Sequence, residues 1–125
     1  MPGITLDAGA LIALDRNDRR VVALIARAHE TGAKIVVPAG AFAQAIRKPE
    51  RQARLSRLVR QPGTTVTPLD RVDGVRVGRL LAASGTADVV DAHVVVCARR
   101  ERTAIVTSDA GDIRALDGDL PLVEL

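Results

Sequence analysis

The spacing of apolar residues alternates between short continuous runs and helical repeats along the whole chain. Short apolar runs bounded by turn residues predict strands at residues 4–6, 34–37, 64–67, 103–107 and 120–123. Helical spacing predicts helices at residues 8–14, 19–31, 39–47, 50–60, 71–83, 87–100 and 109–116. Because parallel strands need long crossover connections, this alternation predicts a parallel sheet covered by helices on both faces.

Two helices carry the clearest predictions about burial. In the helix at 71–83, the apolar stripe is expected to consist of Val72, Val75, Leu80 and Leu81. In the helix at 87–100, the run from Ala92 to Ala98 is expected to be fully buried.

Length and composition indicate one ordinary globular domain covering residues 1–125. The chain is 47% hydrophobic and 26% charged, which is a globular and not a disordered profile. No repeat or long linker divides it. No run approaches the roughly 18 apolar residues of a membrane span, so we expect a cytoplasmic protein without membrane contact. The single cysteine, Cys97, excludes an internal disulfide and is interpreted as a core residue.

Basic residues gather in one stretch of a chain whose net charge is +3. This stretch contains a single acid, Glu50, and its basic residues are Arg47, Lys48, Arg51, Arg54, Arg57 and Arg60. One explanation is an ordinary solvated helix face. The other is an electrostatic landing surface for a polyanion such as RNA, with the first four as candidate RNA-binding residues. Phe42 is the only aromatic residue, which argues against an aromatic base-stacking platform.

Five aspartates fall at positions where the fold class predicts a site. Asp7 and Asp109 follow predicted strands and precede predicted helices. Asp112 lies one turn further on, and Asp88 and Asp91 open the most apolar helix three residues apart, so they share a face. Sites in parallel α/β sheets form at the carboxyl ends of strands, so we expect these side chains to meet there.

Each aspartate also has an ordinary structural explanation. Asp7, Asp88 and Asp109 are plausible helix N-caps, and the remaining two are first-turn carboxylates favoured by the helix dipole. Taken together, however, Asp88 and Asp91 are like charges at i and i+3 in the first turn of an apolar helix. Their repulsion costs roughly 0.2–0.5 kcal/mol. A hard divalent cation would offset this repulsion, because Mg²⁺ and Mn²⁺ prefer oxygen ligands. Such an ion supports phosphodiester cleavage.

Other chemistries fit the chain poorly. A dehalogenase-like phosphatase would need a second aspartate two residues after Asp7, where Gly9 stands. A receiver-like domain would need a lysine after the late strand, but the only lysines are Lys34 and Lys48. No Walker-type glycine-rich loop is present. The two histidines form no catalytic pattern: His93 is interpreted as structural or peripheral and His29 as a surface residue.

Four segments, in their order and spacing, resemble the PIN-domain nucleases and, within them, the VapC-type toxins of bacterial toxin–antitoxin pairs. The resemblance covers essentially the whole chain. Its carriers are the segment 6–14 (LDAGALIAL), the Val37-Pro38-Ala39 turn, the segment 88–92 (DVVDA), and Thr107-Ser108-Asp109 with Asp112.

The resemblance implies a Rossmann-like, three-layer α/β/α PIN domain with a mostly parallel sheet of four to five strands. It implies a Mg²⁺- or Mn²⁺-dependent endoribonuclease that acts as a toxin, with RNA as substrate, a small VapB-like antitoxin as partner, and a homodimer as assembly. The catalytic, metal-binding carboxylates would be Asp7, Asp91 and Asp109. Asp88 and Asp112 would bind the metal directly or through water, and Thr107 or Ser108 would support a ligand through a hydroxyl.

One position departs from the PIN pattern. The family usually has a glutamate on the helix after the second strand, and here Gln44 occupies that place. Glutamine keeps an amide oxygen for a metal-bound water but brings no negative charge. The alternative interpretation is therefore a catalytically weak PIN domain that acts mainly by binding RNA or a protein.

Overall fold

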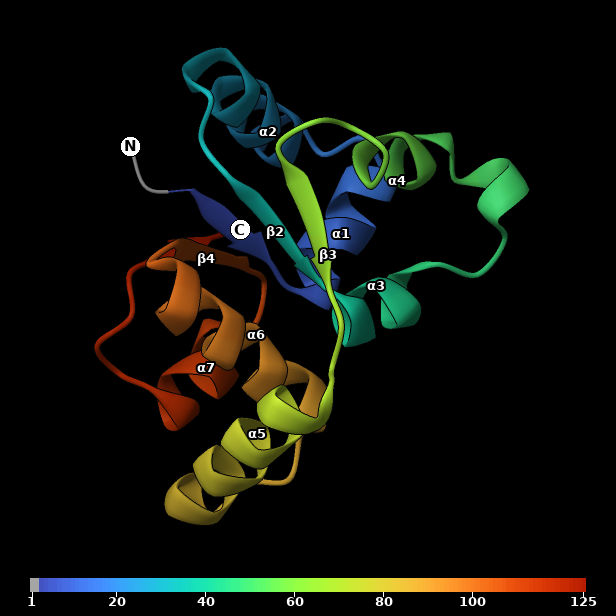
Figure 1. The fold of residues 1–125 in the computed structure, drawn as a ribbon. Coiled ribbons are helices and arrows are strands. Elements are labelled where there is room, and N and C mark those ends of the chain that lie inside the picture. The colour runs from blue at the N-terminus through green and yellow to red at the C-terminus, as the bar shows by residue number, and fades with distance from the viewer. Residues whose placement is uncertain (1–2) are drawn as a thin grey trace.

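The computed structural model describes residues 3–125 and contains one sheet in which every neighbouring pair of strands is parallel. The strands are β1 (Ile4–Leu6), β2 (Ile35–Pro38), β3 (Thr64–Thr67), β4 (Ala104–Thr107) and β5 (Leu122–Glu124). Their order across the sheet is β3-β2-β1-β4-β5 (Figure 1). The predicted α/β class with a parallel sheet is confirmed.

Helices connect each strand to the next. They are α1 (Ala8–Asp15), α2 (Arg19–Thr31), α3 (Ala39–Ala45), the 3₁₀ turn η1 (Pro49–Arg51), α4 (Ala53–Leu58), α5 (Arg71–Ser84), α6 (Val89–Glu101) and α7 (Ala110–Leu116). Local signals set several ends: the Asp18 carboxylate accepts hydrogen bonds from the first turn of α2, and Gly32 ends that helix in a left-handed conformation with φ of 69°.

The order of the strands divides the helices into two layers. The chain moves from β1 through β2 to β3 in one direction and then crosses back to β4 and β5. Because parallel crossovers are almost always right-handed, this reversal puts the two sets of helices on opposite faces. Figure 1 shows α5, α6 and α7 grouped together, apart from α1, α2 and α4. Helix α3 contacts both α1 and α6, so it lies where the two layers meet.

The reversal occurs at β1, which lies between β2 and β4. Leu6 is in register with Val106, and the next residue, Asp7, donates its backbone N–H to the Val106 carbonyl oxygen at 3.2 Å. The carboxyl ends of β1 and β4 are therefore side by side. In open α/β sheets, ligands bind outside the strand ends at such a switch point.

The core is almost entirely aliphatic. Every residue from Ile4 to Leu6, from Ile35 to Pro38 and from Ala92 to Ala98 is buried, as the sequence predicts for the last segment. Full burial of each Val, Leu or Ile contributes roughly 1.5–3 kcal/mol. Within residues 3–125, no single helix is long and apolar enough to cross a membrane. Only α5 and α6 taken together, across a bend of 110°, reach that length and composition.

Two predicted helices are shorter than expected. The helix predicted at residues 39–47 ends at Ala45, because Ile46 turns to an extended backbone. The helix predicted at 50–60 is replaced by η1 and α4, with Gln52 between them. The buried Gln52 side chain accepts hydrogen bonds from the backbone N–H groups of Arg47 and Lys48 and donates one to the Ala45 carbonyl. It thereby satisfies the backbone groups that a continuous helix would have paired.

The apolar stripe predicted for α5 is wrong at two positions. Val72 and Val75 are 47% and 50% exposed. The buried face of α5 instead consists of Asp73, Val77 and Leu80. The helix is rotated relative to the prediction because Asp73 forms buried contacts with α6, described below.

Candidate metal centre

Asp7 is 2% exposed and lies between the end of β1 and the start of α1. Its Oδ1 accepts a hydrogen bond from the Ala10 backbone N–H at 2.7 Å, so it caps α1. Burial raises the pKa of the Asp7 carboxyl above its ordinary value, and the charge of Asp109 raises it further. Hydrogen bonds from the Thr107 side chain and from the Ala10 and Gly9 backbones act in the opposite direction. Asp7 thus serves as a cap and also belongs to an acidic environment.

Asp109 differs from an ordinary N-cap. It occupies the residue before α7, yet its side chain makes no capping hydrogen bond. Its own backbone N–H donates a hydrogen bond to the Thr107 hydroxyl oxygen at 2.8 Å. Asp109 and Asp112 are exposed, and within residues 3–125 neither carboxylate has a hydrogen-bond or ion-pair partner in the protein. Helix capping therefore does not account for these two side chains.

The same distinction, between a carboxylate that caps a helix and one without a protein partner, applies to Asp88 and Asp91. Asp88 caps α6, because its Oδ1 accepts the Asp91 backbone N–H at 2.9 Å. The half-buried Asp91 side chain has no protein partner among the described residues. Burial raises the pKa of the Asp91 carboxyl to about 6, and further contributions come from the charges of Asp88, Asp7, Asp112 and Asp109. All four other aspartates thus act on Asp91, so the structure brings the five predicted residues into one electrostatic cluster.

Two cavities border this acidic cluster. Asp88, Asp91 and Asp112 line a cavity of about 180 Å³. A second cavity, of about 690 Å³, is lined by Gln44, Ser108 and Asp109, together with Gly9, Arg16 and Arg20. Gln44 therefore lines the same cavity as Asp109. Arg16 and Arg20 were not predicted, because nothing in their spacing distinguishes them from other surface arginines.

Gly9 allows the two loops of the site to approach closely. A Cβ atom at this position would lie 2.0 Å from the Ser108 Oγ and 3.4 Å from the Asp7 Oδ1. Glycine leaves room for the Ser108 hydroxyl in its present position. Its role was not predicted, because a glycine in the first turn of a helix carries no signal about a distant contact.

The chemistry of the donors fits a hard divalent cation. All five groups are carboxylates, and burial together with the four acidic neighbours raises the pKa of Asp91, so a bound cation would offset the cost of its charge. No three of the five have ligand oxygens all within 4.8 Å of one another. A divalent ion at this site would therefore contact only one or two of the carboxylates directly and reach the others through water, as Mg²⁺ does in proteins.

A tighter group of possible ligands lies elsewhere. Asp73, His93 and Cys97 are buried, with ligand atoms all within 4.8 Å. The Arg100 guanidinium, however, donates to both Asp73 oxygens, at 2.5 and 3.1 Å, and His93 Nε2 lies 2.8 Å from Asp73 Oδ2. These contacts, Arg100 foremost, lower the pKa of Asp73 to about 2. The Arg100 guanidinium already pairs with the Asp73 carboxylate, so we interpret the group as a structural link between α5 and α6.

This link bears on Cys97, which the sequence assigned to the core, and on His93, which was interpreted as structural or peripheral. A buried histidine needs a polar partner, and Asp73 supplies it. Burial raises the pKa of the Cys97 thiol to about 11, so it stays protonated and unreactive. The structural interpretations of His93 and Cys97 are confirmed, and His29 is exposed as predicted.

The predicted RNA-binding residues lie apart from the acidic cluster. Arg47, Lys48, Arg51 and Arg54 are exposed, and none lines either cavity beside the aspartates. Arg47 donates to the carbonyls of Ala43 and Ile46, and Arg54 donates to that of Asp15. Their role in RNA binding stays a prediction.

Comparisons with known proteins bear on this arrangement. The PIN domain family matches residues 4–118, a span that includes all five aspartates and Gln44. A comparison with curated proteins gives no match. PIN domains are generally nucleases that use divalent metals. The fold, the match over nearly the whole chain and the acidic cluster agree, and the chain belongs to the PIN domain family.

Proposed function

We propose that the protein is a Mg²⁺- or Mn²⁺-dependent endoribonuclease whose metal is held by Asp7, Asp91 and Asp109, with Asp88 and Asp112 contributing directly or through water. The observation that carries this proposal is the convergence of four aspartates on Asp91, whose pKa rises to about 6. A structural role alone gives no reason to gather five like charges at a strand-end switch point. When bound, the ion would supply Lewis-acid chemistry at a phosphodiester.

The protein's own residues organise the site. Thr107 accepts the Asp109 N–H and hydrogen-bonds the Asp7 carboxylate, so one buried side chain fixes both strand-end acids. Ser108 presents its hydroxyl to the cavity that also contains Gln44. These groups would orient the phosphate and a water molecule, and Gln44 would do so through its amide without adding charge.

The biological role we propose is that of a VapC-type toxin in the cytoplasm, restrained by a small VapB-like antitoxin. Support comes from the resemblance of the strand-end segments to VapC-type members of the PIN domain family. We further propose a homodimer. Val72 and Val75 on α5 are about half exposed, and a second copy of the chain would cover such apolar side chains.

The test is cleavage of RNA by pure protein with and without metal. Wild type should cleave single-stranded RNA in Mg²⁺ or Mn²⁺ and lose cleavage in EDTA. Asp91→Asn and Asp109→Asn should keep the circular dichroism spectrum and lose at least about a hundredfold in rate, the scale of a lost electrostatic contact in catalysis. Cleavage that persists in EDTA, or unimpaired variants, would refute the proposal. Asp119→Asn, on the exposed loop before β5, is the matched control and should cleave like wild type.

A second candidate function has one observation in its favour. Gln44 lies in the cavity with Asp109 but carries no charge, so metal affinity is expected to be lower than with glutamate. The protein would then act mainly by binding RNA or a protein. Gln44→Glu separates the two: a large gain in Mn²⁺ affinity and cleavage identifies an attenuated nuclease, and absence of cleavage by both proteins identifies a binder.

A further inference from the structure

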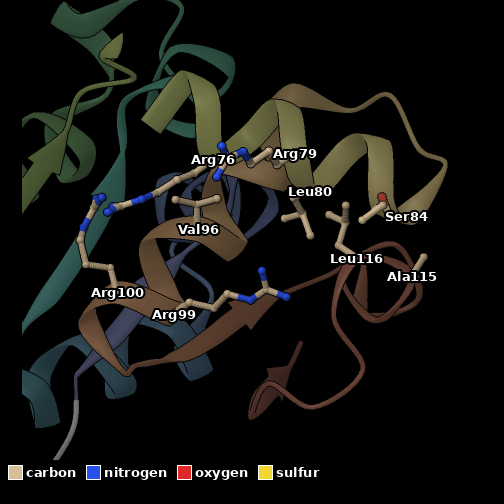
Figure 2. Close-up of a pocket in the computed structure, with 10 residues that line it drawn as sticks. Arg76, Arg79, Leu80, Ser84, Val96, Arg99, Arg100, Ala115 and Leu116 are labelled. Atoms are coloured by element: carbon tan, nitrogen blue, oxygen red, sulfur yellow. The ribbon is translucent and has the colours of Figure 1, made fainter. Parts of the chain in front are cut away.

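A cavity of about 790 Å³ lies outside the acidic cluster, between α5, α6 and α7 (Figure 2). Four arginines line it: Arg76 and Arg79 from α5, and Arg99 and Arg100 from α6. Figure 2 shows Arg79 and Arg99 beside the aliphatic side chains that form the floor of the cavity, whereas the guanidinium groups of Arg76 and Arg100 point away from Leu80 and Leu116. Leu80, Val96 and Leu116 form that floor.

The four arginines exceed the acids that pair with them. Arg100 is held by the buried Asp73, and Arg99 Nε donates to Asp117 at 2.7 Å. Arg76 is 53% exposed and lies 3.7 Å from the already occupied Asp73. No acid among the described residues forms an ion pair with Arg79. The cavity therefore carries two positive charges more than its own acids balance.

The cavity lies next to the smaller cavity at the acidic cluster. Ala115 and Leu116 line it and also line the small cavity that contains Asp88, Asp91 and Asp112. Along α6, Arg99 lies eight residues from Asp91, which is roughly 12 Å at the helical rise per residue. A chain that crosses the aspartates can thus reach the arginines within a few nucleotides.

Positive charge also lies on the other side of the acids. Arg16 and Arg20 line the cavity that contains Ser108 and Asp109, where Asp18 lies 3.7 Å from Arg20 and balances one of the two charges. Five aspartates repel a polyanion, so a nucleic acid that reaches them needs basic anchors outside them. The arginine-lined cavity is the larger of the two anchors and the one with an apolar floor.

We propose that this cavity is a subsite for single-stranded RNA, which takes a nucleotide a few positions from the phosphate at the acidic cluster. The guanidinium groups of Arg76 and Arg79 contact phosphate oxygens, and the base lies against the aliphatic floor and the planar faces of Arg99 and Arg100. Arginine planes take the place of aromatic rings in stacking unpaired RNA bases, and this chain has only one aromatic residue. The inference rests on the proposed nuclease function.

RNA is favoured over an acidic protein segment because the cavity is adjacent to the acidic cluster. An acidic protein helix would need only the apolar floor and the positive rim, and gives no reason for the cavity to lie beside the aspartates. Single-stranded RNA that reaches the aspartates would use both the positive rim and this proximity.

The test measures binding of a fluorescein-labelled 12-nucleotide single-stranded RNA by anisotropy, in an Asp91→Asn background that keeps the RNA intact. Arg79→Gln is the variant, and Arg27→Gln on α2 is its control, since both positions are exposed and the charge change is equal. Arg79→Gln should weaken binding roughly two- to fivefold at low salt. The slope of log affinity against log salt should fall by about 0.7, the value for one lost phosphate contact on a single strand. Arg27→Gln should change neither quantity.

The outcomes separate this subsite from the nuclease itself. If wild type cleaves RNA and Arg79→Gln cleaves it with the same KM, the subsite is wrong and the nuclease stands. If Arg79→Gln binds RNA normally but loses binding of an Asp/Glu-rich helical peptide, the cavity is a protein-docking surface and the proposal is overturned. If wild type neither binds nor cleaves any RNA, the nuclease proposal fails first and the subsite fails with it.

Discussion

The buried Thr107 hydroxyl connects the two strand-end aspartates: its oxygen accepts the Asp109 backbone N–H at 2.8 Å, and it hydrogen-bonds the Asp7 carboxylate. Thr107→Val keeps the shape of the side chain and removes both contacts. We expect a loss of about 1–3 kcal/mol in the free energy of unfolding, because a buried carboxylate and an amide lose their partner. Metal affinity should fall as well.

Urea unfolding and Mn²⁺ titration calorimetry measure these two effects, with Thr107→Ser as the control. Serine keeps the hydroxyl and should restore most of the metal affinity. If Val and Ser variants bind Mn²⁺ equally well, the hydroxyl does not position the acids.

Gly9 should be intolerant of a single added methyl group. In Gly9→Ala the new Cβ would meet the Ser108 Oγ at 2.0 Å, so the Ser108 hydroxyl must leave its present position and cleavage should fall. Gly74→Ala on α5 is the matched control, because no atom lies within 4 Å of its Cβ position. It should stabilise the helix by about 0.5–1 kcal/mol.

Combining Gly9→Ala with Ser108→Ala distinguishes a steric effect from a chemical one. This pair removes the closest atom and leaves a contact of 3.2 Å with the Ser108 Cβ, so part of the loss caused by the clash should be recovered. If the pair is no better than Gly9→Ala alone, crowding by the Ser108 hydroxyl is not the cause.

The link between α5 and α6 should make stability depend on acid pH. Contacts from Arg100 and His93 lower the pKa of Asp73 from 3.8 to about 2 in the folded protein. A lowered folded pKa gives stability that is fully present above about pH 4 and is lost as pH falls toward 2. Its size is about 2 kcal/mol. Urea unfolding between pH 2 and 6 should show this loss in wild type and not in Asp73→Asn, which should be less stable near neutral pH.

Exposed valines on α5 supply the test of the proposed dimer. Val75→Asp places a charge where Val75 is 50% exposed, so the fold should survive and a dimer formed through this face should dissociate. Val22→Asp on α2, where the side chain is 38% exposed, is the control. Light scattering after gel filtration gives the masses. Dissociation by the Val22 change alone would exclude the α5 face.

Periodicity was sufficient to predict the sheet and most helices, because strand runs and amphipathic repeats are local properties of the sequence. The errors involve polar side chains that act over a distance. Hydrogen bonds to the Gln52 side chain take the place of helical backbone hydrogen bonds around residues 46–51. The buried Asp73 determines which face of α5 packs against the rest of the protein. No rule of apolar spacing identifies a buried glutamine or aspartate whose partner lies on another element.

The five aspartates were predictable as a group because the strand ends of a parallel sheet meet at one edge. Their division into roles was not. Asp7 and Asp88 cap helices, whereas Asp91, Asp109 and Asp112 have no protein partner among residues 3–125. Only side-chain geometry separates a capping carboxylate from a free one.

The central claim is that the aspartates form a metal centre, and thermal unfolding of wild type and Asp91→Asn with and without Mn²⁺ tests it most directly. Asp91 is held near four like charges, so in EDTA the Asp91→Asn protein should be more stable than wild type. Added Mn²⁺ should raise the Tm of wild type, since a ligand that binds only the folded state stabilises it, and should raise that of Asp91→Asn much less. A wild-type Tm that does not respond to Mn²⁺ or Mg²⁺, or an Asp91→Asn protein stabilised as much as wild type, would contradict the claim.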